Sequence, residues 1–166
     1  EAAGAILLVG CNPRHDAPLL GHRVRKAWKR GATIDVVNPV RHDFHFGTRH
    51  EQITGTWGMA GALASLAKAA AGDRAVPESI ADLVAAAEAG AEARATVDSL
   101  RDAGESVLLF GDFAVQHPAA SRLRALARAD RLAGVDAAHA AQASEELGQG
   151  AEAIQDIANA VIRARE

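Results

Sequence analysis

The sequence contains one cysteine and no tyrosine, and aromatic residues make up only 4% of its 166 positions. A single cysteine cannot form a disulfide within the chain, and it cannot ligate an iron–sulfur cluster unaided. No apolar run approaches the roughly 20 residues of a membrane-spanning helix, so no direct membrane insertion is expected. The net charge of −3 provides no global attraction to nucleic acid, so no nucleic-acid partner is expected either.

The strongest structural signal lies in the first twenty residues. The apolar run from Ala5 to Val9 predicts a strand that is buried on both faces. Gly10, Asn12 and Pro13 predict a turn at its end, and a helix pattern begins directly after them. This strand–turn–helix order is how an α/β domain builds a ligand crevice at the carboxyl edge of a parallel sheet.

Two further segments predict the rest of the sheet. Residues 33–37 are mostly β-branched and predict a strand parallel to the first, and residues 106–110 predict a third buried strand. The predicted fold class is therefore α/β, with three α-β-α layers and a mostly parallel sheet. We expect three parts along the chain: a β-α-β unit with its loop (1–56), a helical insert (57–104) and a second α/β half (105–166).

The remaining segments give local expectations. Helical spacing of apolar residues predicts helices that begin near residues 17, 57, 77 and 91, and one that ends near residue 129. The polar stretch 40–56 predicts a surface loop with one short extended piece at 44–46. A fourth short strand is expected at 132–135, and an amphipathic segment at 151–165. Because the chain opens only a few residues before a strand that should be central, we expect a piece of a longer protein.

The glycine turn has two interpretations. A glycine lets the backbone approach a ligand, and the following helix N-terminus offers free N–H groups to a phosphate. The segment 10–13 lacks both the three glycines of a dinucleotide fingerprint and the Lys-Ser/Thr of a phosphate-binding loop. A plain tight turn explains it equally well. After the third strand, Gln116 and His117 either point into the same crevice as Asn12 and Asn38 or cap the next helix.

Other candidate residues have plainer explanations. Three histidines, His42, His45 and His50, have superficially metal-like spacing, but a loop without cysteine partners favours an exposed segment. Cys11 has no nucleophile signature around it, so a packing role is favoured. The first helix has a basic face that could dock a partner or attract phosphate, although a solvated surface is the simpler interpretation. This face consists of Arg23, Arg25, Lys26, Lys29 and Arg30.

The strand ends also carry a family resemblance. Segment 6–13 (Ile-Leu-Leu-Val-Gly-Cys-Asn-Pro) and segment 34–39 (Ile-Asp-Val-Val-Asn-Pro) resemble the dinucleotide-binding core of the molybdopterin oxidoreductases. Segment 108–117 is similar to a segment with a Gln-His pair in the same superfamily. Within this superfamily, residues 8–20 and 23–28 are similar to the large iron–sulfur subunit of bacterial NADH-quinone oxidoreductase, which is respiratory complex I.

This resemblance implies a Rossmann-like lobe of the molybdopterin oxidoreductase fold. It implies a guanosine nucleotide near Gly10, Asn12 and Pro13, held by an acidic residue at the end of the second strand. That position is Asn38 here. The missing carboxylate favours a vestigial crevice, to which Gln116 would also belong. We therefore expect no catalytic residue, metal ligand or cofactor in this chain, with molybdopterin guanine dinucleotide only under the alternative of an active enzyme.

The resemblance further implies a structural, non-catalytic piece of a proton-translocating NADH:quinone oxidoreductase. The parent chain would carry iron–sulfur clusters outside this segment, and its partners would be other complex I subunits. Its place would be peripheral, on the cytoplasmic side of a bacterial inner membrane. Two alternatives stay open: the cofactor-binding domain of an active molybdopterin guanine dinucleotide oxidoreductase, and a stand-alone nucleotide-binding module.

Overall fold

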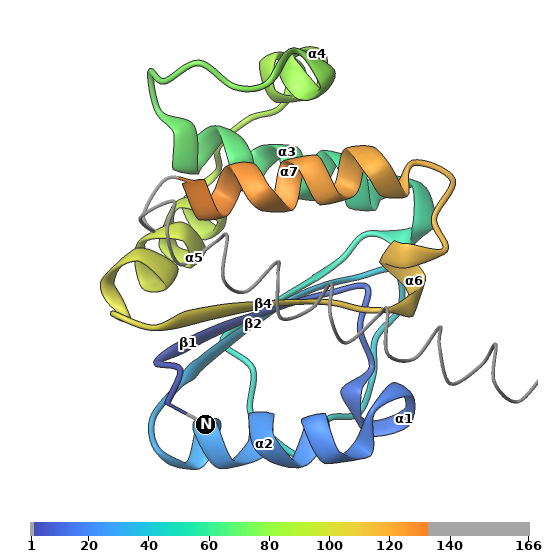
Figure 1. Ribbon diagram of the computed structural model, residues 1–166, viewed down its shortest axis with the longest axis vertical. Coiled ribbons are helices and arrows are strands. Elements are labelled where there is room, and N and C mark those ends of the chain that lie inside the picture. The colour runs from blue at the N-terminus through green and yellow to red at the C-terminus, as the bar shows by residue number, and fades with distance from the viewer. Residues whose placement is uncertain (1, 133–166) are drawn as a thin grey trace, which may run out of the picture. The chain divides into compact units, whose positions relative to one another are not determined.

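A computed structural model describes residues 2–132, and Figure 1 shows how their helices and strands are layered. The predicted strands at 5–9, 33–37 and 106–110 are confirmed, as are helices near each predicted position. In chain order the elements are β1 (Ala5–Val9), α1 (Pro13–Asp16), α2 (Pro18–Lys29), β2 (Thr33–Asn38), β3 (His50–Ile53), α3 (Gly55–Ala71), α4 (Glu78–Ala86), α5 (Ala91–Asp102), β4 (Ser106–Phe110), α6 (Asp112–Val115) and α7 (Ala120–Leu132).

The four described strands form one parallel sheet in the order β3-β2-β1-β4. The chain steps from β1 outward to β2 and β3, and then returns to the other side of β1 with β4. The carboxyl ends of β1 and β4 therefore meet at the point where the strand order reverses, which is where open α/β sheets bind ligands. In Figure 1, α1 and α2 lie below the sheet and α3, α5 and α7 lie above it, so the predicted three-layer α/β fold is confirmed.

Both faces of the sheet are buried, each by its own hydrophobic cluster. Successive side chains of a strand point to opposite faces, so Leu7 of β1 packs under the helices α3 to α7, whereas Leu8 packs over α2. On the first face, α3 packs against α4, α5 and α7, and its inward residues include Met59 and Leu63, which are fully buried. On the second face, Val24 of α2 is the largest buried side chain that the helix contributes.

Two local predictions are wrong. The extended piece lies at His50–Ile53, where β3 pairs with β2, and not at 44–46. Phe44 and Phe46 instead stack with ring centroids 5.0 Å apart and pack against the cluster above α2. The strand β4 is not fully buried, because it lies at the edge of the described sheet and Val107 is 36% exposed.

The division into three parts stays a prediction. Helix α3 belongs to the expected insert and packs against α7 of the expected second half, so both contribute to one layer. Residues 133–135 of the expected fourth strand and the segment 151–165 lie outside the described residues, whereas Leu132 ends α7. Within residues 2–132, no helix combines the length and the apolar character that crossing a bilayer requires.

Candidate functional site

The candidate site is the carboxyl edge of the sheet, where the ends of β1, β2 and β4 meet. The Gly10 N–H donates to the carbonyl of Val37 at 2.9 Å, which ties the end of β1 to β2. On the other side, the Gly111 N–H donates to the carbonyl of Val9 at 2.9 Å. The predicted residues Gly10, Asn12, Pro13 and Asn38 are therefore brought to one edge by the strand register.

Asn38 braces the turn after β1 with both ends of its amide. Its Oδ1 accepts from the Cys11 N–H at 2.8 Å, and its Nδ2 donates to the Cys11 carbonyl at 3.0 Å. The side chain is fully buried. A carboxylate has the same shape but no N–H to donate, so it would face the Cys11 carbonyl without a hydrogen bond. The amide that replaces the family's expected acid thus suits a contact within the protein.

The two glycine turns lie directly against each other. Gly10 has a φ of +55°, and a Cβ at this position would lie 2.6 Å from the Ala114 backbone nitrogen. A Cβ on Gly111 would lie only 2.4 Å from the Cys11 Cα. The Phe113 N–H also donates to the Gly10 carbonyl at 3.1 Å. Because glycine has no side chain, the two backbone segments can approach each other closely at the point where the strand order reverses.

Asn12 and His42 form the polar part of the edge. Asn12 Nδ2 donates to His42 Nδ1 at 3.1 Å, so the imidazole carries its proton on Nε2. The Asn12 N–H donates to the Asp16 carboxylate at 2.9 Å. Two buried atoms of this pair have no hydrogen-bond partner, Asn12 Oδ1 and His42 Nε2. They supply one acceptor and one donor, which can hold a small polar group.

Cys11 is buried and its sulfur forms no disulfide. Burial raises the pKa of its thiol to about 12, and the nearby carboxylates of Asp16 and Asp112 add to the shift. The thiol is therefore protonated at neutral pH, and only a thiolate acts as a nucleophile or metal ligand. These properties fit the packing role that the sequence favours.

Gln116 and His117, which follow the third predicted strand, lie in different environments. Gln116 is exposed at the C-terminal end of α6, and its place in the crevice stays a prediction. His117 is buried and caps the next helix: its Nδ1 accepts from the Ala119 N–H at 3.0 Å. Its Nε2 therefore carries the proton and donates to the Thr56 carbonyl at 3.1 Å. His117 joins the N-terminal ends of α7 and α3.

The three histidines with metal-like spacing lie in three different environments. His42 contacts Asn12 at the sheet edge, His45 lies beside α2, and His50 begins β3. Across residues 2–132, no three His, Cys, Asp or Glu side chains gather closely enough to hold a metal ion.

The polar feature that sequence reasoning missed is an ion pair between a buried carboxylate of β2, Asp35, and the partly exposed Arg49 just before β3. Asp35 is only 3% exposed, and its Oδ1 accepts from Arg49 Nε at 3.0 Å. Its second oxygen pairs with Arg49 Nη2, and Oδ1 also accepts from the His50 N–H at 3.2 Å. A signal was present, because a carboxylate inside the apolar strand 33–37 must find a partner. This ion pair fixes the start of β3 against β2.

Comparison with known families now identifies the class of protein. A family model described as molybdopterin oxidoreductase matches residues 1–160, and the chain belongs to this family. The family predicted from the sequence is confirmed.

Similarity to one particular protein supports the resemblance to the complex I subunit that the sequence indicated. The chain is 47% identical over 55 residues to the mitochondrial NADH-ubiquinone oxidoreductase 78 kDa subunit of Neurospora crassa. The matched segment is 30% of this chain and 7% of that protein, so the chain spans only a small part of the relative's length. This match confirms the similarity to a complex I subunit that the sequence indicated.

Proposed function

We propose that the chain is a structural, non-catalytic part of the large iron–sulfur subunit of a respiratory NADH:quinone oxidoreductase. In this proposal it supports electron transfer from NADH to quinone by holding and shielding the regions that carry the iron–sulfur clusters, which lie elsewhere in the parent chain. Its partners are other complex I subunits, and its place is peripheral, on the cytoplasmic side of a bacterial inner membrane.

The observation that carries this proposal is the contact between Asn38 and Cys11. At the position where the family resemblance implies an acidic residue for the nucleotide, an amide binds the protein's own backbone through both its oxygen and its nitrogen. A ribose or guanine placed there would have to break two buried hydrogen bonds, and each unsatisfied group left behind costs about 1–3 kcal/mol. This cost favours a turn that is kept for architecture.

The glycine turns support the same conclusion. The space that a glycine opens for a pyrophosphate is taken up at Gly10 by the backbone of Ala114, and at Gly111 by Cys11. These contacts favour turns that pack against the protein's own backbone over turns that hold a molybdopterin guanine dinucleotide in the way the resemblance implies. We derive no catalytic step through that cofactor.

The test is metal and pterin analysis of the full-length parent protein. The proposal expects iron and acid-labile sulfide in the parent, without stoichiometric molybdenum or tungsten and without a fluorescent pterin after oxidation. A parent that contains one molybdenum or tungsten together with a pterin would overturn it. The reading frame upstream of Glu1 gives an independent check, since ferredoxin-type cysteine clusters are expected there.

One observation favours the alternative of a domain that binds a guanine dinucleotide. Asn12 Oδ1 and His42 Nε2 are buried atoms without a partner, and such atoms are often satisfied by a ligand or a water molecule. Under this alternative, or as a stand-alone nucleotide module, guanine nucleotide in excess should raise the melting temperature. The rise should disappear in Asn12→Ala. No shift in the unaltered protein would count against both alternatives.

A further inference from the structure

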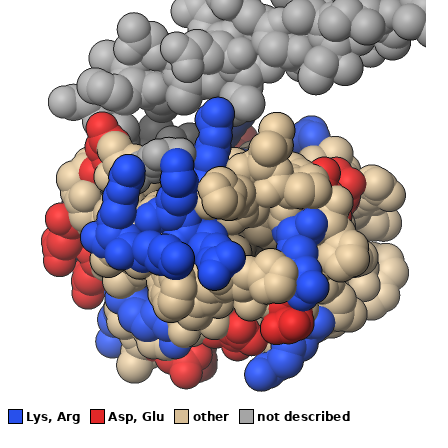
Figure 2. Space-filling model, turned by 90° about the horizontal axis from the view of Figure 1, so that it is seen from below, with Lys and Arg blue, Asp and Glu red and all other residues tan. Residues whose placement is uncertain are grey.

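The face of α2 that points away from the sheet is strongly basic. Figure 2 looks onto this side of the molecule, where Lys and Arg side chains gather. The exposed cations of this basic face are Arg23, Arg25, Lys26, Lys29 and Arg30, and Arg14 of the neighbouring helix α1 is exposed beside them. These six residues are a third of the 18 lysines and arginines of a chain whose net charge is −3.

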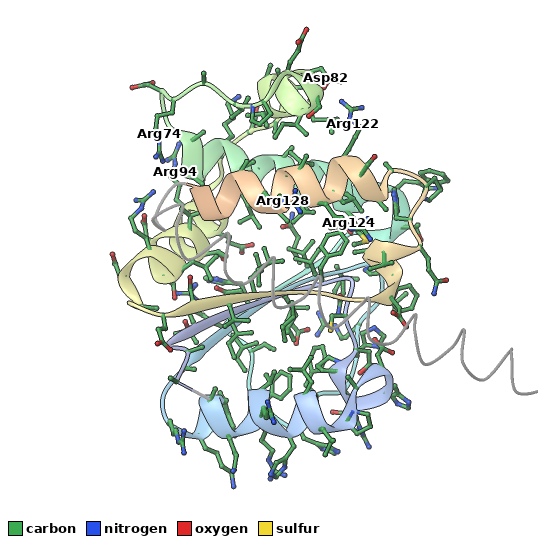
Figure 3. All side chains as sticks on the ribbon, viewed as in Figure 1. Arg74, Asp82, Arg94, Arg122, Arg124 and Arg128 are labelled. Carbon is green, nitrogen blue, oxygen red and sulfur yellow. The ribbon has the colours of Figure 1, made fainter. Side chains whose placement is uncertain are left out.

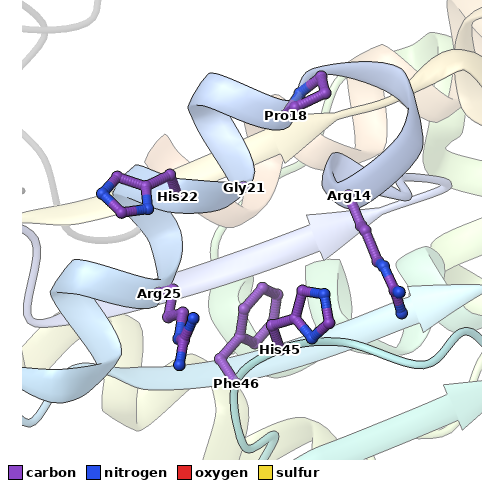
Figure 4. A pocket seen from close by; sticks show the side chains of 7 residues that line it. All are labelled: Arg14, Pro18, Gly21, His22, Arg25, His45 and Phe46. Atoms are coloured by element: carbon purple, nitrogen blue, oxygen red, sulfur yellow. The ribbon is translucent and has the colours of Figure 1, made fainter.

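A pocket of about 280 Å³ opens at one end of this basic face. It lies between α1, α2 and the loop that joins β2 to β3. In Figure 4, Arg14 and Arg25 lie on either side of His45, with Phe46 beside it. No acidic side chain lines the pocket; its lining consists of Arg14, Pro18, Gly21, His22, Arg25, His45 and Phe46.

The pocket is built by contacts that fix its walls. Phe46 is 9% exposed and stacks on Phe44, so the floor is apolar and ordered by the hydrophobic cluster above α2. Gly21 lets α2 lie close to α1, because a Cβ there would lie 2.8 Å from the Pro13 carbonyl oxygen. Arg14 donates to the carbonyl and the carboxylate of Asp43, both at 3.3 Å, which holds its guanidinium at the rim.

We propose that this pocket and the basic face of α2 dock an acidic segment of a neighbouring protein, whose carboxylates enter between Arg14 and Arg25. This rests on the proposed function only in placing the chain within an assembly. Guanidinium groups bind carboxylates in a bidentate manner, and a concave site with several cations attracts such groups from a distance.

Apolar side chains on the same helix favour a protein partner over a free anion or a lipid surface. Leu19 is 83% exposed beside the pocket, and Trp28 is 39% exposed among the cations. Arginine together with exposed large apolar and aromatic residues is typical of protein interfaces, whose centres are fully desolvated on binding. A free inorganic anion would gain nothing from Leu19 or Trp28.

The test measures binding of a fluorescein-labelled peptide of alternating Glu and Ala to the full-length parent, purified free of its neighbours. Fluorescence anisotropy at low salt should show saturable binding that Arg25→Glu weakens by about tenfold or more, because a reversed charge repels the peptide. The matched control is Arg128→Glu, which changes the charge equally on α7 in the opposite layer (Figure 3). It should weaken binding by less than about twofold. A second variant, His45→Ala, should weaken binding less than Arg25→Glu does.

Other outcomes would overturn the proposal. Equal weakening by the two arginine variants would mean attraction by net charge alone. Binding of inorganic phosphate or of phosphatidylglycerol vesicles, lost in Arg25→Glu while the acidic peptide does not bind, would assign the pocket to a free anion or to a membrane surface. All of these outcomes are independent of the metal and pterin content that tests the proposed function.

Discussion

The two faces of the sheet are covered to very different depths. On one face, α3 is flanked by α4, α5 and α7, and these helices pack against one another as well as against the strands. On the other face, the cover that the described residues provide consists of one long helix, α2, the short helix α1, and Phe44 and Phe46 of the loop after β2. Figure 1 shows the difference in thickness between the two layers.

This difference separates stability from recognition. The thick layer is rich in alanine, and four alanines of α3, Ala62, Ala64, Ala67 and Ala70, are buried against other helices. Small side chains let helices approach closely, so this layer holds the fold together. The thin layer carries the basic face and the pocket, and it joins the sheet edge through Cys11. Segments that bind ligands are often drawn from the less stable parts of a fold, so the thin layer suits the docking site that we propose.

The largest effect is expected from a matched pair on β1. Leu7 and Leu8 are neighbours, both are fully buried, and they point to opposite faces. Replacing a buried leucine by alanine costs about 2–5 kcal/mol, and the cost grows with the cavity that remains. We expect Leu7→Ala to lower the free energy of unfolding more than Leu8→Ala, because a single helix can settle into the space whereas interlocked helices cannot.

Urea unfolding followed by circular dichroism measures both values. Leu109→Ala, at a partly buried position of β4, serves as a control with a smaller cost. Equal losses for Leu7→Ala and Leu8→Ala would mean that the thin layer is as rigid as the thick one, and would remove the distinction drawn between them.

The next effect concerns the brace between the thin layer and the sheet. Asn38→Asp keeps the shape of the side chain but removes the donor to the Cys11 carbonyl. We expect a loss of about 1–3 kcal/mol at neutral pH. Amide hydrogen exchange should become faster in α1 and α2 than in α3 and α7. Uniform acceleration across both layers would contradict the comparison.

The pH dependence of Asn38→Asp gives a second measurement. Burial and the facing carbonyl should raise the pKa of the introduced carboxyl in the folded state above its unfolded value of about 3.9. The stability that the protonated form provides is therefore full below that unfolded value and is lost as the pH rises through the folded pKa. The variant should recover part of its stability in acid relative to the unaltered protein, in which Asn38 does not titrate.

The sheet and its layers were predictable because the strands that build the centre are short apolar runs bounded by turn residues. The strand Ala5–Val9 has no polar side chain, and its residues are buried in the hydrophobic clusters on both faces of the sheet. The strand β3 was not predictable, because His50–Ile53 is polar and half exposed, and nothing in its own side chains selects a strand. Its place is set by backbone pairing to β2 and by the Asp35–Arg49 ion pair, which joins distant residues.

The candidate site was predictable in its position but not in its contacts. Residues at the carboxyl ends of parallel strands meet at one edge of the sheet, so the sequence was enough to predict that Gly10 and Asn38 lie near each other. That Asn38 binds the backbone of Cys11, and that Gly111 lies against the same residue, depends on strand register and turn geometry. The pocket beside α2 depends equally on how the loop folds back, and the sequence indicated only its basic helix.

Cys11 makes the thin layer sensitive to alkali. Burial raises the pKa of its thiol from 9.0 to about 12, so the neutral thiol adds stability that is full below pH 9.0 and is lost as the pH rises toward 12. We expect a loss on the order of 1 kcal/mol over the first pH unit above 9.0. The difference between the unaltered protein and Cys11→Ala isolates this contribution. If the two pH profiles run parallel above pH 9.0, the thiol is not desolvated in the folded state.

The smallest effect is expected on the outer side of the thick layer. Asp82 of α4 pairs with Arg122 of α7 (Figure 3), and this hydrogen bond is the main reason why the pKa of Asp82 is lowered. A lowered pKa means that any stability from the pair is present above the usual carboxyl pKa of 3.8 and is lost as the pH falls through the folded value. The Asp82 side chain is 66% exposed, so water screens the pair and the cost of ordering two side chains offsets most of the attraction.

Asp82→Asn should therefore leave the melting temperature unchanged within error, as should the control Asp98→Asn, whose partner is Arg101. A drop as large as that of Asn38→Asp would show that the thick layer depends on its surface charges, and would place part of its stability outside the alanine-rich core.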